Sequence, residues 1–343
     1  MGKNIVVFSD GTGQDGGRRY DTNVYKLFCM VENRTDRQVT FYDRGLGTGL
    51  RKLSGQITGA GISKNIKDCY QFIFEEFKAG DSIYLFGFSR GATTVRSLSS
   101  FIHLFGILPK SRPELIEQAY RIYKIGRNEK RDRKAAEFVR RHHNMWTRIR
   151  FIGAWDTVAA LGIPIKVIDV VLGKLPFLRH RFQDLRLSKS VEHARHALAI
   201  DDERKIFQPV PWDTSLEDYQ TLQQVWFCGS HTDVGGGYPE QALADLALIW
   251  MRDEAVRQGL RIYPHHTREM HPDPDGLMHN PRGTWLTRFY RREARSWNSA
   301  THGKPVIHES VLQRTLGPDN SASTPYRPWI LAEDYDVWRN GTD

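Results

Sequence analysis

Short apolar runs alternate with longer stretches of helical spacing along most of the chain. Apolar runs between turn residues are typical of buried strands, whereas apolar side chains three and four positions apart mark one face of a helix. Ile66, Tyr70, Ile73 and Phe77 have the helical spacing. The pattern predicts strands at residues 5–8, 39–42, 82–86, 149–154 and 224–228, and helices at residues 62–78, 92–105 and 243–258.

This order of elements indicates the fold class. Strands that alternate with helices favour a mostly parallel sheet covered by helices on both faces. The chain has 343 residues, of which 40% are hydrophobic and 26% charged, a composition typical of folded globular proteins. We therefore expect residues 1–343 to form a single α/β domain.

Positive charge is concentrated in one part of the chain. The formal net charge is +9, and residues 121–150 hold eleven Lys or Arg against three acidic residues. We predict that residues 106–148 form a basic helical insertion, which contains most of this stretch. The basic stretch is either a solvated helical face or a docking surface for anionic lipid or nucleic acid.

A second segment is unusually apolar. Within residues 161–178 the only charged side chains are Lys166, Asp169 and Lys174. The stretch fits either a buried helix or a lid over an active site, and we predict an apolar lid at residues 159–190.

Neither a disulfide framework nor a targeting segment is expected. The three cysteines, Cys29, Cys69 and Cys228, are far apart and odd in number, which favours a reduced compartment. The first apolar run is too short for a signal peptide, and no stretch is long and apolar enough for a membrane-spanning helix. The expected location is cytoplasmic. Export by a route that does not use a cleaved signal peptide is the open alternative.

The motif Gly87-Phe88-Ser89-Arg90-Gly91 lies between a predicted buried strand and a predicted helix. In α/β-hydrolases a sharp strand-to-helix turn of this kind holds the central serine in strained backbone geometry and exposes its hydroxyl. The flanking glycines allow strand and helix to pass closely, and the helix N-terminus offers free N–H groups to a developing oxyanion. We therefore predict an α/β-hydrolase-like fold with Ser89 as the nucleophile and the Arg90 N–H as an oxyanion donor.

A serine nucleophile needs a base, and the base needs a carboxylate to orient it. In this fold the acid and the histidine follow the serine in that order, each after a later strand. Asp156 and His231 directly follow predicted strands and are the predicted acid and base. Asp233 is predicted to hold the His231 loop or to lie just behind the base. The alternatives are Asp201 or Asp202 as the acid and His308 as the base.

The loop after the first strand has two interpretations. Gly11-Thr12-Gly13-Gln14-Asp15-Gly16 matches the dinucleotide-binding pattern, with Asp43 placed as a ribose-binding acid. That pattern opens directly into a helix, whereas the cap signal Asp21-Thr22-Asn23 comes several residues later. In the hydrolase interpretation, Gly11 or Thr12 supplies the second oxyanion N–H and Asp10 braces the loop.

Six motifs occur in order along most of the chain. They are Phe8-Ser9-Asp10-Gly11-Thr12-Gly13, Tyr42-Asp43-Arg44-Gly45-Leu46-Gly47-Thr48-Gly49, Gly87-Phe88-Ser89-Arg90-Gly91-Ala92, Trp155-Asp156-Thr157-Val158, His231-Thr232-Asp233-Val234-Gly235-Gly236-Gly237-Tyr238, and His308-Glu309-Ser310-Val311 with Tyr326-Arg327-Pro328. Together they resemble the α/β-hydrolase domain of type VI secretion phospholipase effectors and their uncharacterised relatives. The resemblance implies a Ser-Asp-His triad at Ser89, Asp156 and His231, and ester hydrolysis on phospholipids. It also makes type VI secretion the candidate route of export.

The sequence thus predicts a serine hydrolase that cleaves carboxylic esters, as a lipase or an A-type phospholipase, through an acyl-enzyme. No metal or organic cofactor is expected, and the expected partner is a phospholipid or another ester. Residues 121–150 are predicted to meet an anionic membrane surface, and no specific nucleic acid is expected. The alternative is a hydrolase fold that has lost catalysis and binds anionic membrane or nucleic acid.

Overall fold

A single parallel sheet forms the centre of the molecule. The computed structural model describes residues 2–11, 17, 20–45, 59–158, 185–265, 269–283, 290–316 and 325–340. Within these residues, eight strands pair in the order β2-β1-β3-β4-β5-β6-β7-β8, and every neighbouring pair is parallel. The strands are β1 Asn4–Ser9, β2 Gln38–Asp43, β3 Ser82–Phe88, β4 Ile149–Trp155, β5 Val191–Ala199, β6 Thr221–Phe227, β7 Val306–His308 and β8 Asp336–Trp338.

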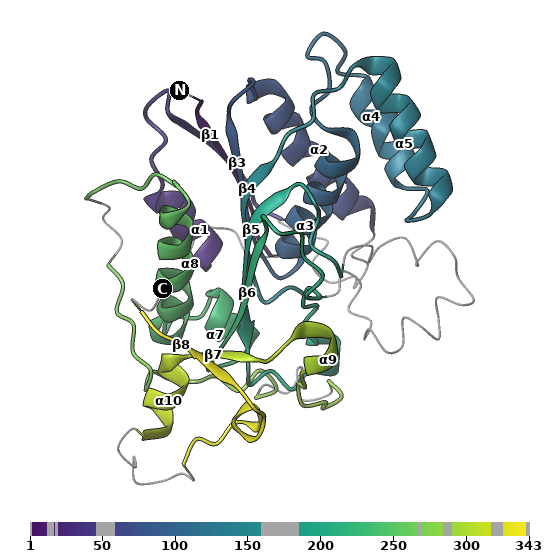
Figure 1. Ribbon diagram of the computed structural model, residues 1–343. Coiled ribbons are helices and arrows are strands. Elements are labelled where there is room, and N and C mark those ends of the chain that lie inside the picture. Colours follow the sequence, from purple (N-terminus) through teal and green to yellow (C-terminus); the bar gives the residue numbers. More distant parts are fainter. Residues whose placement is uncertain are drawn as a thin grey trace.

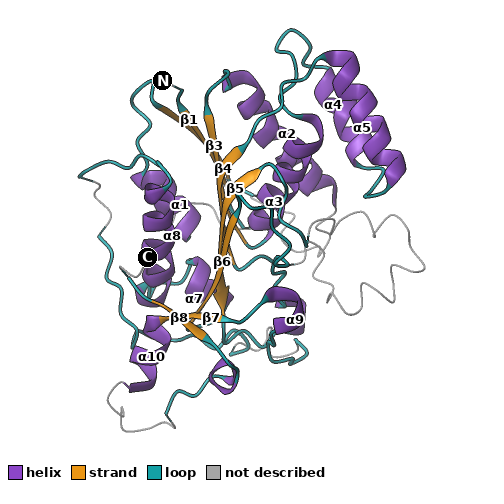
Figure 2. Ribbon diagram, in the orientation of Figure 1, coloured by secondary structure: helices purple, strands orange, loops and turns teal. Residues whose placement is uncertain are grey.

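Helices cover both faces of this sheet (Figure 1, Figure 2). Helices α2, α3, α4 and α5 lie on one side, and α1, α7, α8 and α10 lie on the other. Alternate residues of β1 enter different apolar cores: Ile5 and Val7 pack with α2 and α3, whereas Val6 and Phe8 pack with α1 and α8. The helices are α1 Asn23–Met30, α2 Gly59–Glu76, α3 Arg90–Phe105, α4 Leu115–Tyr123, α5 Glu129–His142, α7 His231–Gly235, α8 Ala242–Arg257, α9 Ser299–His302 and α10 Glu309–Leu316.

The predicted α/β-hydrolase-like fold class is confirmed. The five predicted strands and three predicted helices are present, with ends shifted by at most a few residues. The sequence pattern did not predict β5, β7 and β8. Helices α4 and α5 fall inside the predicted insertion at 106–148, whereas residues 159–184 of the predicted lid lie outside the described residues. None of the described helices is long and apolar enough to cross a bilayer.

The order of strand addition reverses beside β1. Because β2 lies on one side of β1 and β3 on the other, the carboxyl ends of β1 and β3 flank a topological switch point, where ligands of open α/β sheets bind. The two ends are in close contact, since a Cβ atom on Gly91 would lie 2.0 Å from the carbonyl oxygen of Ser9. Only glycine fits there, so this contact brings the loop after β1 against the turn after β3.

Candidate active site

Ser89 occupies a strained turn between β3 and α3. Its backbone angles are φ 58° and ψ −119°, a left-handed conformation that costs a non-glycine residue roughly 1–3 kcal/mol. A Cβ atom on Gly87 would lie 2.5 Å from the carbonyl oxygen of Gly91, so the turn requires glycine there. Ser89 is 7% exposed, and no described residue forms a hydrogen bond with its hydroxyl. The hydroxyl is therefore available to a substrate.

Asp156 and His231 meet beside this turn. Asp156 follows β4 with φ 38°, a second strained position, and its Oδ2 lies 2.5 Å from His231 Nδ1. His231 is the first residue of α7, which follows β6. Its ring lies 4.6 Å, centroid to centroid, from the ring of Phe88, the residue before Ser89. Trp155, which precedes Asp156, accepts a hydrogen bond from the Ser89 N–H at 3.0 Å through its carbonyl. The structure thus brings Asp156 and His231 into contact and places each of them beside the turn at Ser89. All three residues belong to the described part of the chain, and the Ser89 hydroxyl forms no hydrogen bond with His231.

The charges of this pair suit a neutral base. Burial favours the protonated form of Asp156, but the charge and hydrogen bonds of Arg295, followed by those of His231, hold the pKa of Asp156 well below its usual range. Burial lowers the pKa of His231 and outweighs the opposing effect of Asp156. Because the carboxylate accepts a hydrogen bond from the Nδ1–H, Nε2 keeps its lone pair and is free to accept a proton.

The base is held from several directions. The backbone N–H of His231 donates to Asp202 Oδ2 at 3.2 Å, and the ring of Phe207 contacts the imidazole edge-to-face at 4.9 Å. Asp233 accepts from the N–H and hydroxyl of Ser230, each at 2.8 Å, and so caps α7. It also accepts from the Nδ1 of His279 at 2.7 Å. Asp233 therefore holds the His231 loop and makes no direct contact with the imidazole.

The alternative acids have other partners. Asp201 accepts from the Gly229 N–H at 2.7 Å and from the Tyr326 hydroxyl at 2.8 Å, and burial raises its pKa to about 6. Asp202 forms a bidentate pair with Arg204 and contacts only the backbone of His231. Neither carboxylate orients an imidazole ring, whereas Asp156 does.

The alternative base, His308, lies in an aromatic stack. Its ring is 4.7 Å from that of Phe227 and 5.1 Å from that of Trp338, and its Nδ1 bonds the hydroxyl of Ser310 at 2.8 Å. No carboxylate among the described residues forms a hydrogen bond with His308. Burial lowers the pKa of this imidazole to about 4. His308 therefore has a structural environment, without an orienting acid.

Replacing His308 with glutamine is expected to leave activity intact and to reduce the loss of folding stability at acidic pH. The folded state binds fewer protons than the unfolded state between pH 6.5 and 4, because the folded pKa is about 4. The native His308 therefore removes about 2 kcal/mol of stability as pH falls from neutral to 5. Denaturant unfolding at pH 7.5 and pH 5 checks this, since glutamine does not titrate. An inactive but folded His308→Gln protein would instead identify His308 as the base.

The two predicted sources of oxyanion donors differ. Arg90 is the first residue of α3, and no described residue accepts its N–H, as expected at a helix start. The Gly11 N–H, in contrast, donates to Asp10 Oδ1 at 2.7 Å. Contrary to the prediction, this N–H is therefore not free to bind an oxyanion. Thr12, the other predicted donor, lies outside the described residues.

Asp10 forms hydrogen bonds within and around the loop after β1. Besides Gly11, it accepts from the hydroxyls of Thr22 at 2.6 Å and Tyr42 at 2.7 Å, and burial raises its pKa to about 6. Helix α1 starts at Asn23 and is capped by Thr22, whereas residues 12–16 of the Gly11 motif lie outside the described residues. In the described part of the chain, no cluster of His, Cys, Asp or Glu could hold a metal ion.

Sequence reasoning did not identify Arg295, which is a partner of Asp156 in the structure. Its Nη1 donates to Asp156 Oδ1 at 2.6 Å and its Nη2 to Oδ2 at 2.8 Å, with both side chains fully buried. The two residues are 139 positions apart. No motif surrounds Arg295, so only the folded chain reveals this contact.

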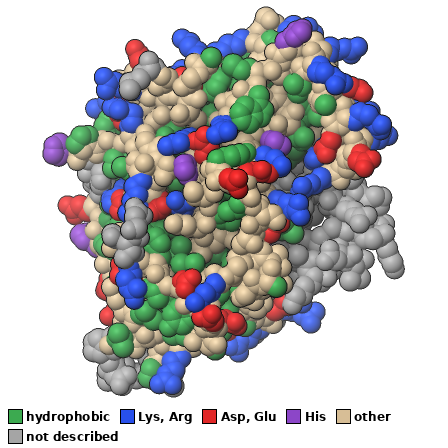
Figure 3. Space-filling view, viewed as in Figure 1, with side chains coloured by type: hydrophobic (Ala, Val, Ile, Leu, Met, Phe, Trp, Pro, Cys, Tyr) green, Lys and Arg blue, Asp and Glu red, His purple; other side chains and the backbone are tan. Residues whose placement is uncertain are grey.

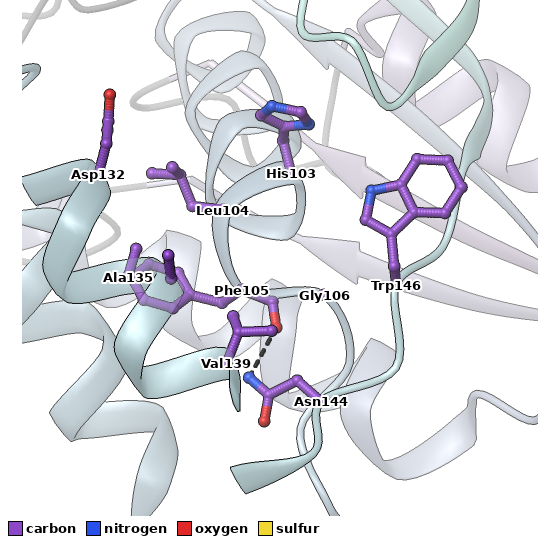
Figure 4. A pocket seen from close by; sticks show the side chains of 10 residues that line it. His103, Leu104, Phe105, Gly106, Asp132, Ala135, Val139, Asn144 and Trp146 are labelled. Atoms are coloured by element: carbon purple, nitrogen blue, oxygen red, sulfur yellow. Dashed lines mark hydrogen bonds between the residues drawn. The ribbon is translucent and has the colours of Figure 1, made fainter. Parts of the chain in front are cut away.

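A cavity of about 250 Å³ lies elsewhere, between the end of α3 and α5. In Figure 4, His103 and Trp146 flank it, and the Asn144 amide donates to the Phe105 carbonyl at 2.7 Å. Helix α3 has 16 residues and is therefore about 24 Å long. Because Ser89 precedes its first residue, this cavity lies at the opposite end of the helix from the candidate triad.

Comparison with known proteins identifies a family that matches most of the chain. Residues 3–254 match the family model for the T6SS phospholipase effector Tle1-like catalytic domain. The uncharacterised protein YEL023C of Saccharomyces cerevisiae is 28% identical over 258 residues, which make up 68% of this chain and 36% of the yeast protein. This chain therefore spans about a third of the curated relative that it matches.

Two solved structures are also similar. One is the Tle1 effector bound to the VgrG spike of the type 6 secretion system, at 18% identity and a TM-score of 0.37, with 70% of this chain and 52% of that chain covered. The other is an uncharacterised protein from Pseudomonas aeruginosa, at 15% identity and a TM-score of 0.47, with 80% and 49% covered. This chain spans about half the length of either.

Proposed function

Since the chain belongs to the family of T6SS Tle1-like phospholipase effector catalytic domains, we propose that it is a serine esterase that hydrolyses acyl esters of phospholipids. One observation carries the proposal. The carboxylate of Asp156 orients a buried, neutral His231, whose ring packs beside the strained turn that presents Ser89. An acid that orients a neutral base, beside a turn that presents a serine, supports acyl transfer through a Ser-His-Asp triad.

The reaction proceeds in two halves. Ser89 Oγ attacks the ester carbonyl carbon while His231 Nε2 accepts the hydroxyl proton, and the Arg90 N–H stabilises the oxyanion of the tetrahedral intermediate. The C–O bond to the leaving alcohol breaks as His231 returns the proton to that oxygen, which leaves an acyl-Ser89 ester. Water, deprotonated by His231, then attacks this ester, and the fatty acid leaves as the serine recovers its proton.

A basic surface supports a lipid substrate. Nine of the eleven basic residues between 121 and 150 are exposed, and α5 turns Ala135 and Phe138 toward the core. In Figure 3, Lys and Arg side chains line the upper right of the molecule, where α4 and α5 lie, with some acidic side chains among them. We propose that this surface attracts anionic headgroups by long-range electrostatics. The exposed basic residues are Arg121, Lys124, Arg127, Lys130, Arg133, Lys134, Arg140, Arg141 and Arg148.

Product analysis on defined vesicles tests both parts. We expect the protein to release fatty acid and lysophospholipid from phosphatidylcholine vesicles, and to do so faster when phosphatidylglycerol is included. The increase is expected to fall when ionic strength rises from about 0.01 M to 1 M, because the screening length drops roughly tenfold. Absence of fatty acid from every vesicle and from short p-nitrophenyl esters would overturn the esterase proposal. An equal rate on neutral and anionic vesicles would overturn the role of the basic surface.

A further inference from the structure

Arg295 binds Asp156 and two backbone carbonyls through its terminal nitrogens, Nη1 and Nη2, whereas its buried Nε has no hydrogen-bond partner among the described residues. Besides the two bonds to Asp156, Nη1 donates to the Ala199 carbonyl at 2.5 Å and Nη2 to the Phe207 carbonyl at 2.8 Å. Its side chain is 0% exposed. The residue lies outside residues 3–254, which match the family model, so the C-terminal part of the chain contributes to the candidate site.

Asp156 accepts four hydrogen bonds, which fix its carboxylate in one orientation. Oδ1 of Asp156 accepts from Arg295 Nη1 and from the Ala199 N–H at 3.0 Å, so the oxygen facing the imidazole is Oδ2. Oδ2 is shared between Arg295 Nη2 and His231 Nδ1. A planar guanidinium that binds both oxygens sets the carboxylate plane as well as its position. The hydrogen bond between His231 Nδ1 and Oδ2 therefore orients the imidazole as well.

The charges around His231 are balanced in pairs. Asp156 is paired with Arg295, and Asp202 is paired with Arg204 at 2.6 Å. Phe88 and Phe207 cover the ring with uncharged surface. His196 lies behind Asp156, where its Nε2 accepts a hydrogen bond from the Thr157 N–H. Burial lowers the pKa of His196 to about 3, so this imidazole adds no charge. On α7 itself, Asp233 forms hydrogen bonds with His279 Nδ1 and with the Ser230 N–H, and so caps the helix.

We propose, on the basis of the function proposed above, that Arg295 is a positioning residue that clamps Asp156 against His231 and cancels its charge, so that the imidazole enters the reaction neutral. An uncompensated carboxylate at 2.5 Å would favour the imidazolium form. With Arg295 in place, protonation of His231 creates an unbalanced positive charge in a buried site. The base therefore stays free to accept the Ser89 proton at mildly acidic pH.

Two substitutions separate the charge of Arg295 from its geometry. Arg295→Gln removes the charge, and we expect the protonation midpoint of His231 to rise by about one to three pH units. Arg295→Lys keeps the charge but loses the two-pronged contact, so the midpoint is expected to stay near that of the native protein while kcat falls by about 10- to 100-fold. Arg292→Gln is the matched control, because Arg292 lies three positions away and forms an exposed pair with Glu203.

The test follows the imidazole nitrogens of His231 by NMR as pH is varied, together with the acid limb of kcat/KM. The native midpoint is expected below 6.5, with the control unchanged and the glutamine variant raised. A native midpoint at or above 6.5, or a folded Arg295→Gln protein with an unshifted midpoint, would overturn the proposal. The native titration remains informative if the glutamine variant does not fold. The NMR readout needs no turnover, so it is distinct from a failure of the esterase function itself.

Discussion

Replacing Ser89 with alanine is expected to lower kcat by about four to six orders of magnitude, because the acyl-enzyme cannot form without the hydroxyl. The residual rate would come from the oxyanion donors and from substrate binding. Alanine relieves none of the positive φ at this position, so the fold and its strain are expected to persist. Rates on p-nitrophenyl butyrate and on phospholipid vesicles, normalised to folded protein, provide the measurement.

The same change at Ser97, in α3, is the matched control. Ser97 lies two turns further along the helix, and its carbonyl accepts the Tyr123 hydroxyl at 3.1 Å, a bond that alanine preserves. Ser97→Ala is therefore expected to retain nearly native rates. If Ser89→Ala were as active as this control, another residue would have to be the nucleophile.

Replacing Asp156 with asparagine is expected to lower kcat by about 10⁴-fold. An amide in this position does not stabilise the imidazolium, and its NH₂ group favours the tautomer of His231 with its proton on Nε2. The change also leaves the buried guanidinium of Arg295 without a counter-charge, which is expected to cost about 3–5 kcal/mol of stability. Kinetics and denaturant unfolding of the same preparation check both effects.

Asp201→Asn serves as the control for this second prediction. Asp201 is also a buried carboxylate after a strand, but it holds Gly229 and Tyr326 instead of an imidazole. An asparagine oxygen can accept either bond, so near-native activity is expected. An inactive Asp201→Asn protein beside an active Asp156→Asn protein would reassign the acid.

Local chemistry made the nucleophile turn predictable from the sequence. The requirement for Gly87 comes from backbone atoms of Gly91 and Ala92, only a few positions away, and the buried strand before Ser89 is a continuous apolar run. The requirement for Gly91, in contrast, comes from the backbone of Ser9, which only the fold brings near. The order in which acid and base follow the serine is likewise a property of the chain. For these reasons the sequence predicts the strand-to-helix turn, which the structure has at Ser89, and it predicts the pairing of Asp156 with His231.

The features that the sequence did not predict depend on distant partners. Strand β5 contains Arg195 and His196, which are polar but buried, because Arg195 pairs with Glu254 from α8 at 2.5 Å. No apolar run therefore marked this strand. The Gly11 N–H was predicted as an oxyanion donor because the sequence does not show which N–H groups the carboxylate of Asp10 accepts when it braces the loop. Arg295 likewise depends on a contact that only the fold creates.

The most direct test of the account is active-site labelling with a fluorophosphonate, followed by mass spectrometry of the intact chain and its peptides. The reagent reacts only with a serine activated by a neighbouring base. We predict one label per native chain, located on the peptide that contains Ser89, and no label on Ser89→Ala. A native chain that remains unlabelled, or one labelled at a different residue, would contradict the assignment of Ser89 as the nucleophile of a serine esterase.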